Sequence, residues 1–138
     1  MNVKRYVIGS LAVWVMIFLF EFVFHGMLLK GMYEGVRHLL RPEESFVRFF
    51  FWVVLGELML AFGFCYIFIK GYEGRGVAEG VRFGLYAGIA FMASTMIINY
   101  AVQPWPGSLT AAWIIGYLIE LMLAGVVIAA IYKPATTS

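Results

Sequence analysis

Charged side chains are scarce in this 138-residue chain: they make up 13% of it, whereas 63% of its residues are hydrophobic. Soluble domains carry about 25% charged residues, so this sequence is too poor in charge to cover a core with a water-facing shell. The net charge of +2 is small and spread along the chain, without the basic stripe that binds nucleic acid. We therefore expect a membrane protein with no nucleic-acid partner.

Cysteine and histidine are also rare, which excludes several kinds of cofactor site. Cys65 is the only cysteine, so neither an intramolecular disulfide nor a thiolate metal cluster can form. A bis-histidine haem site lacks its second ligand, because His25 lies in an apolar stretch and His38 lies in a loop. No lysine lies inside an apolar stretch to carry a retinal-type Schiff base. A divalent metal ion held by three glutamates and one histidine is chemically feasible, but we predict neither a metal site nor a cofactor.

Long apolar stretches, by contrast, occur four times. Each exceeds the ~20 residues that cross a ~30 Å hydrocarbon layer. Continuous helices satisfy their own backbone groups there, and the alternating pattern of barrel strands is absent. We predict an all-α membrane protein, a four-transmembrane-helix bundle that forms a single integral membrane domain over residues 1–138. The expected helices lie near residues 6–29, 46–69, 81–102 and 109–132.

The placement of lysine and arginine predicts the orientation of the bundle. One face would carry six of these residues: Lys4, Arg5, Lys70, Arg75, Arg82 and Lys133. The other face would carry four: Lys30, Arg37, Arg41 and Arg48. Six against four favours both termini on the same, cytoplasmic side, with the first helix retained as a signal anchor. The absence of a transit-like segment favours a prokaryotic plasma (inner) membrane.

The loops carry two local signals. Pro42 followed by Glu43 and Glu44 is typical of a helix start, because proline suits the first turn and acidic residues favour the positive end of the helix dipole. The stretch Glu34–Leu40 is a candidate short interfacial helix. The loop over residues 70–80 is rich in glycine, which indicates a flexible connection.

Small residues mark two helix faces as packing surfaces. On the third predicted helix, three glycines recur at every fourth position: Gly80, Gly84 and Gly88. On the fourth predicted helix, small residues surround Glu120 with the same spacing: Ala112, Gly116 and Ala124. We therefore expect Glu120 to face a neighbouring helix. We expect the glycine face of the third helix to make a close helix contact, either within the bundle or between subunits.

Three of the four apolar stretches contain one glutamate each: Glu21, Glu57 and Glu120. A carboxylate in hydrocarbon is costly and is often functional. At 1.5 Å per residue, all three lie roughly 12–16 Å from the outer ends of their helices, so they can share one layer. His25 lies one turn from Glu21 on the same face, and Thr95 and Asn99 would complete the layer from the third helix. The predicted polar intramembrane cluster comprises Glu21, His25, Glu57, Thr95, Asn99 and Glu120.

Charge arithmetic in this layer indicates a function. His25 is the only candidate cation at that depth, and desolvation and mutual repulsion both disfavour three charged carboxylates. At least one carboxyl group should therefore hold a proton unless a cation is bound. This favours a proton- or cation-coupled transport or channel unit that acts as an oligomer. The alternative is a non-catalytic accessory subunit of a larger membrane complex. An enzyme is disfavoured, because no nucleophile–base pair and no metal set is complete.

Overall fold

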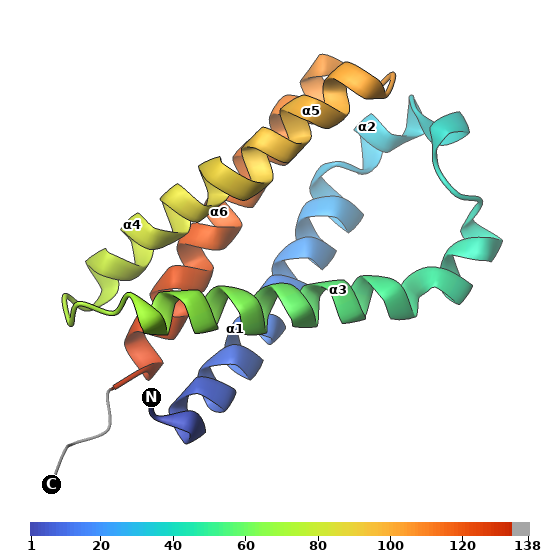
Figure 1. The fold of residues 1–138 in the computed structure, drawn as a ribbon. Coiled ribbons are helices and arrows are strands. Elements are labelled where there is room, and N and C mark those ends of the chain that lie inside the picture. Colours follow the sequence, from blue (N-terminus) through green and yellow to red (C-terminus); the bar gives the residue numbers. More distant parts are fainter. Residues whose placement is uncertain (134–138) are drawn as a thin grey trace, which may run out of the picture.

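The computed structural model describes residues 1–133, and every element in this range is a helix (Figure 1). Two of the four long helices contain a π-helical segment. The elements in chain order are α1 (Val3–Val23), η1 (Phe24–Leu28), α2 (Lys30–Glu34), η2 (Arg37–Leu39), α3 (Glu43–Lys70), α4 (Val77–Ala87), η3 (Gly88–Ala93), α5 (Ser94–Val102) and α6 (Gly107–Ile131).

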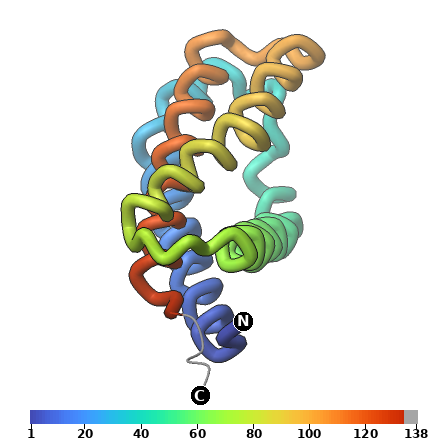
Figure 2. Tube along the Cα trace, turned by 60° about the vertical axis from the view of Figure 1, so that its left-hand side comes forward, coloured from blue at the N-terminus to red at the C-terminus, as the bar shows by residue number. Residues whose placement is uncertain are grey.

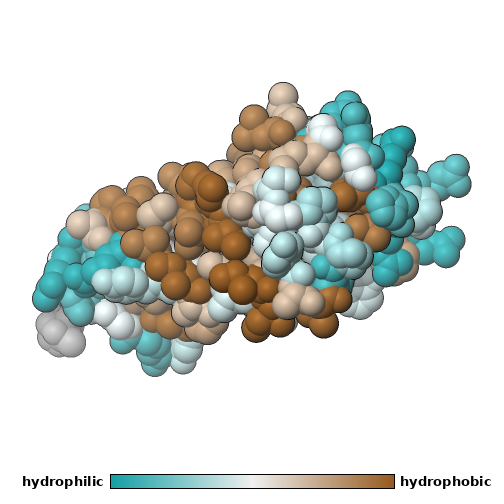
Figure 3. Space-filling view, turned by 90° about the horizontal axis from the view of Figure 1, so that it is seen from above, coloured by the Kyte–Doolittle hydropathy of each residue, from teal (hydrophilic) through white to brown (hydrophobic). Residues whose placement is uncertain are grey.

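Four continuous helices are long and apolar enough to cross a membrane, as the sequence predicted. They span Val3–Leu28, Glu43–Lys70, Val77–Val102 and Gly107–Ile131. Hydrophilic residues gather at the two ends of the molecule and hydrophobic residues lie between them (Figure 3). These helices indicate an integral membrane protein.

The glycine face of α4 packs against α6 of the same chain. A Cβ atom added at Gly80 would collide with the carbonyl oxygen of Gly125, and one added at Gly84 would collide with that of Leu121. Gly88 meets the side chain of Leu118 in the same way. The expected close helix contact is therefore present, and it lies within one chain, because α6 covers this face.

Helix α1 packs along another face of α6. Its buried residues include Gly9, Val13 and Ile17, which recur at every fourth position. A Cβ atom at Gly9 would collide with the side chain of Ile128, near the C-terminal end of α6. Helices α1 and α6 run in opposite directions. Helix α6 contacts both α1 and α4 and lies between them (Figure 1).

Helix α3 crosses the other helices obliquely, and only its second half is covered (Figures 1 and 2). Its buried residues are confined to the C-terminal half: Ala61, Phe64, Cys65, Phe68 and Ile69. In the N-terminal half, Val47 and Phe51 are exposed. The first half of α3 therefore diverges from α1 and α6 and leaves a space between them.

The beginning of α1 and the end of α6 meet at one end of the bundle. Arg5 Nη1 donates a hydrogen bond to the carbonyl oxygen of Ile131 at 2.8 Å. The loop between α3 and α4 lies at the same end, because the ring of Tyr72 is 5.4 Å from that of Tyr132. We call this the terminal end.

The loop at the terminal end is held by one buried carboxylate. Glu79, in the first turn of α4, accepts hydrogen bonds from the backbone N–H groups of Glu73 at 2.6 Å and Arg75 at 2.7 Å. Gly74 and Gly76 have φ angles of 81° and 70°, which side-chain-bearing residues rarely adopt. The loop is thus anchored at defined points despite its glycine content.

The opposite end of the bundle, here the pocket end, is formed by α2, η2 and the loop before α6. The short helix expected over residues 34–40 is not continuous: α2 ends at Glu34, and η2 follows over Arg37–Leu39 as a single 3₁₀ turn. Helix α3 begins at Glu43, directly after Pro42, as the sequence predicted.

Candidate functional site

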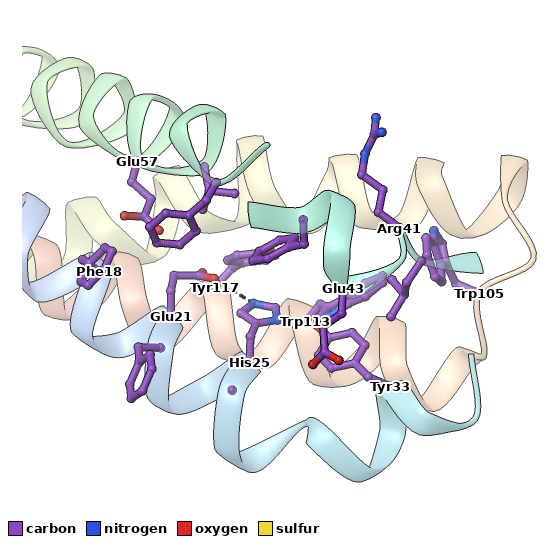
Figure 4. Close-up of a pocket in the computed structure, with 16 residues that line it drawn as sticks. Phe18, Glu21, His25, Tyr33, Arg41, Glu43, Glu57, Trp105, Trp113 and Tyr117 are labelled. Carbon is purple, nitrogen blue, oxygen red and sulfur yellow. Dashed lines mark hydrogen bonds and ion pairs between the residues drawn. The ribbon is translucent and has the colours of Figure 1, made fainter. Parts of the chain in front are cut away.

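A pocket of about 760 Å³ occupies the space where α3 diverges from α1. Aromatic side chains form much of its wall, including Phe18 of α1, Phe50 of α3 and Trp113 of α6. The ionisable side chains that line it include Glu21, His25 and Glu57 (Figure 4). The pocket thus joins the predicted carboxyl layer to the pocket end of the bundle.

A chain of polar side chains enters this pocket from α2. Trp113 Nε1 donates a hydrogen bond to the hydroxyl oxygen of Tyr33 at 2.8 Å. The hydroxyl of Tyr33 is also hydrogen-bonded to Nδ1 of His25. An indole N–H can only donate, so the Tyr33 oxygen accepts from Trp113 and its own hydrogen remains available to His25.

The state of the Tyr33 phenol fits this assignment. Burial raises the pKa of the Tyr33 hydroxyl above its ordinary value of 10.0, although the hydrogen bond from Trp113 opposes the shift. The phenol therefore keeps its hydrogen at neutral pH and donates it to Nδ1 of His25. In a neutral imidazole that accepts at Nδ1, the ring hydrogen sits on Nε2.

Nε2 of His25 faces Glu21. The distance from Nε2 to Oε2 of Glu21 is 2.9 Å, and both side chains are about three-quarters buried, with exposed fractions of 24% and 23%. The two residues are four positions apart, on the face that continues from Ile17 of α1. His25 itself belongs to the π-helical segment η1, a geometry that often occurs at functional sites.

The other two predicted glutamates lie close to this pair. Glu120 is 1% exposed, on the α6 face that includes Gly116 and Ala124. It lies near enough to Glu21 and Glu57 for the charges of the three carboxyl groups to interact. Oε1 of Glu120 and Oε2 of Glu57 are buried, and neither has a hydrogen-bond partner among the described residues.

Two predicted members of the layer lie elsewhere. The hydroxyl of Thr95 donates to the carbonyl oxygen of Phe91, and the amide of Asn99 donates to that of Thr95 at 3.0 Å. Both side chains thus bond to the backbone of their own helix, and neither lines the pocket. The π-helical segment η3 separates α4 from α5. Because a π-helix has more residues per turn, Thr95 and Asn99 do not lie on the helix face that carries the glycines.

Three functional candidates were missed by the sequence argument: Tyr33, Trp113 and Tyr117. Tyr33 belongs to a loop in the sequence and reaches His25 only because α2 folds back over the end of α1. Trp113 and Tyr117 lie on α6 at a spacing of four residues, which places them on one helix face. That spacing, together with Glu120 three residues later, was the available signal.

Of the small residues on this face of α6, Gly116 and Ala124 are buried and Ala112 is partly buried. Gly116 allows the ring of Phe24 to approach α6, since a Cβ atom there would collide with it. Ala112 packs against the cluster of Leu29, Val36 and Leu109 at the pocket end.

Among residues 1–133, no three histidine, cysteine, aspartate or glutamate side chains converge closely enough to hold a metal ion. Glu21, His25 and Glu57 line the pocket, and Glu120 lies buried on α6 outside its lining. The arrangement suits the transfer of protons between neighbouring groups better than the coordination of a single ion.

The chain matches no protein-family model, and neither curated proteins nor solved structures include a significant match. Its function must therefore be inferred from the geometry of the pocket.

Proposed function

We propose that the chain is a proton-coupled transport unit of a prokaryotic plasma membrane, in which Glu21, Glu57 and Glu120 bind and release the protons. The observation that carries the proposal is the polar chain from Trp113 through Tyr33 and His25 to Glu21. It leads from the pocket end of the bundle to carboxyl groups that lie within the membrane-spanning helices.

The charges near these groups support proton binding. His25 is 2.9 Å from Glu21, and no ion-pair partner is found for Glu57 or Glu120 among the described residues. A charged carboxylate without a partner is strongly disfavoured inside a membrane, so the group either holds a proton or attracts a cation. A carboxyl group that alternates between holding a proton and binding a cation is the basis of proton-coupled transport.

We propose that protons move from Tyr33 through His25 to Glu21. Tyr33 passes its hydroxyl hydrogen to Nδ1 of His25 and regains a proton from water, which converts the ring to imidazolium. The hydrogen on Nε2 can then pass to a charged Glu21, whose Oε2 lies 2.9 Å away. A histidine is suited to this step because an imidazole ring can accept a proton at one nitrogen and release one from the other. Tyr33 positions the ring, and Trp113 in turn positions the hydroxyl of Tyr33. Glu21 then shares the proton with Glu120 and Glu57.

Access from the pocket end is provided by a second hollow of about 790 Å³. It adjoins the first and shares His25, Tyr33 and Arg41 with it. The hollow is lined mainly by polar residues of α2, η2 and the loop before α3, so water can supply protons to the His25 side of the relay. Four helices are few for a complete pathway, and we propose that the unit works as an oligomer through a face other than the glycine face of α4.

Proton movement in liposomes tests the proposal. Purified protein is reconstituted with an internal pH-sensitive dye, a potential that is negative inside is imposed, and sodium, potassium and then organic monocations are supplied in turn. We expect movement of protons beyond that in empty liposomes with at least one cation. Glu120→Gln preserves shape but cannot release a proton, and it should slow this movement by a factor on the order of a hundred.

Two further variants make the result specific. Tyr33→Phe removes the hydroxyl that positions His25 and should give a smaller loss. Glu73→Gln changes an acid in the loop at the terminal end, whose side chain is 50% exposed and lines neither hollow, and it should leave the rate unchanged. Equal rates for Glu120→Gln and the wild type, or no proton movement with any cation, would refute the proposed function.

A second candidate is an accessory subunit of a larger membrane complex. The diverging first half of α3 favours it, because exposed side chains such as Phe51 and Trp52 offer a surface to a partner helix. Native mass spectrometry of gently solubilised protein distinguishes the two, since a complex of this chain with other proteins supports the accessory role and a homo-oligomer supports the transport unit.

A further inference from the structure

The pocket between α1 and α3 has the size of a small-molecule site. Its volume of about 760 Å³ lies within the range of about 300–1,000 Å³ that is common for such sites. The pocket is far larger than the path from Tyr33 to Glu21 requires, because Tyr33, His25 and Glu21 are already within hydrogen-bond distance of one another. Its size therefore indicates a ligand in addition to protons.

The charged groups around the pocket favour a cation. Three of its lining residues are acidic: Glu21, Glu43 and Glu57. Arg41 is the only arginine or lysine that lines it, and its side chain points away from the other labelled residues (Figure 4). The Arg41 guanidinium instead lies 3.9 Å from the ring centroid of Phe49. Thus no permanent positive charge points into the pocket.

The position of Glu57 defines where a positive charge would be neutralised. Its side chain points from α3 into the space between α3 and α1 (Figure 4). Oε2 of Glu57 is buried without a hydrogen-bond partner among residues 1–133. Glu120 is 1% exposed and also has an oxygen without a hydrogen-bond partner. It lies near enough to Glu57 for the charges of the two carboxyl groups to interact. When these two carboxyl groups lose their protons, no cationic side chain of the described residues is paired with them.

The walls of the pocket select the kind of cation. Phe18 of α1 and Phe50 of α3 both line the pocket, and their rings pack edge to face with centroids 6.3 Å apart. Aromatic faces attract organic cations, and they also bury apolar substituents. A bare metal ion gains little from such walls, and no three of the metal-binding side chain types converge in the described part of the chain.

We propose that this pocket binds a lipophilic organic monocation, such as an aromatic ammonium or phosphonium ion, which displaces the protons held by Glu57 and its neighbours. The proposal rests on the proposed function, because it names the substrate class of the same carboxyl groups. The positive charge lies near Glu57 and Glu21, and the apolar substituents lie against the aromatic walls. The opening between α1 and the first half of α3 admits the ligand.

Binding of tetraphenylphosphonium to the purified protein in detergent tests the inference. Isothermal titration in two buffers of different ionisation enthalpy reports both the affinity and the protons released. We expect saturable binding with release of at least part of a proton. Glu57→Gln should weaken binding by about tenfold or more, because the neutral amide cannot balance the ligand charge.

A pair of phenylalanine variants tests the aromatic wall. Phe50 lines the pocket, whereas the adjacent Phe51 is 64% exposed and does not. Phe50→Ala should weaken binding several-fold, and Phe51→Ala should leave it unchanged. Each variant is first compared with the wild type in elution volume and melting temperature, so that a loss of folding is recognised.

Neutral triphenylphosphine oxide serves as the control ligand. If it binds as tightly as tetraphenylphosphonium, the pocket is a site for neutral amphiphiles and the inference is overturned. Absence of saturable tetraphenylphosphonium binding, or equal affinity in Glu57→Gln and the wild type, overturns it as well. Proton movement in liposomes without such binding would leave the proposed function in place and remove only this substrate class. Binding without proton movement would remove the transport function.

Discussion

The two ends of the bundle are built differently. At the terminal end, glycine residues bring α4 and α6 into backbone contact, and α1 packs against α6 through Gly9. At the pocket end, bulky side chains replace the small ones: Phe24, Trp105 and Trp113 pack together with α2. The covered half of α3 lies toward the terminal end, and its uncovered half borders the pocket.

The terminal end stabilises the bundle, whereas the pocket end gives access to its interior. Small residues let helices approach closely and leave little space between them. Large aromatic residues hold helices apart, and the space that remains becomes a pocket when one helix diverges. A single set of four helices therefore combines a tightly packed end with an open, polar one. The next three predictions test this separation, in order of decreasing effect.

The largest effect concerns which end faces which compartment. The distribution of lysine and arginine predicts that the terminal end faces the cytoplasm. A reporter fused after Ser138 should then be active only in the cytoplasm, whereas one inserted at His38 should be active only in the periplasm. The reverse pattern would exchange the two faces and place the entry of the proton relay in the cytoplasm.

The second effect concerns the glycine contact. Gly84→Leu places a side chain against the carbonyl group of Leu121, which is backbone and cannot rotate away. We expect a loss of stability above the about 1–3 kcal/mol that is typical of overpacking, and a clear drop in melting temperature. Gly63→Leu is the matched control, because a Cβ atom at Gly63 has nothing within 4 Å. Equal melting temperatures for the two variants would show that the terminal end is not held by this contact.

The smallest effect concerns the loop at the terminal end. Glu79→Gln keeps one oxygen but replaces the other acceptor by an amide donor, so one of the two backbone N–H groups loses its partner. The expected cost is about 1–3 kcal/mol, seen as a lower thermal midpoint in detergent. Glu73→Gln removes a half-exposed partner of Arg75 and Arg82, and exposed ion pairs contribute only about 0–1 kcal/mol. The loop argument fails if the Glu73 variant loses as much stability as the Glu79 variant.

Much of the carboxyl site could be predicted because its residues obey helical spacing. Glu21 and His25 are four residues apart and do meet, and Glu120 is buried on the face of small residues where the sequence placed it. Thr95 and Asn99 obeyed the same spacing, yet they bond to their own helix. A π-helical segment shifts the register between them and the glycine face, and residue spacing alone does not reveal such a segment.

The sequence by itself determined the four helices, the start of α3 after Pro42 and the presence of three glutamates within the apolar stretches. These features depend on the length of apolar runs and on local backbone preferences, which neighbouring residues decide among themselves. Only the tertiary structure decided that α6 of the same chain covers the glycine face of α4, that α3 diverges from α1, and that Tyr33 and Trp113 complete the chain to His25. Those outcomes depend on which helix surfaces fit together across the bundle, and side chains far apart in sequence determine that fit through their shape.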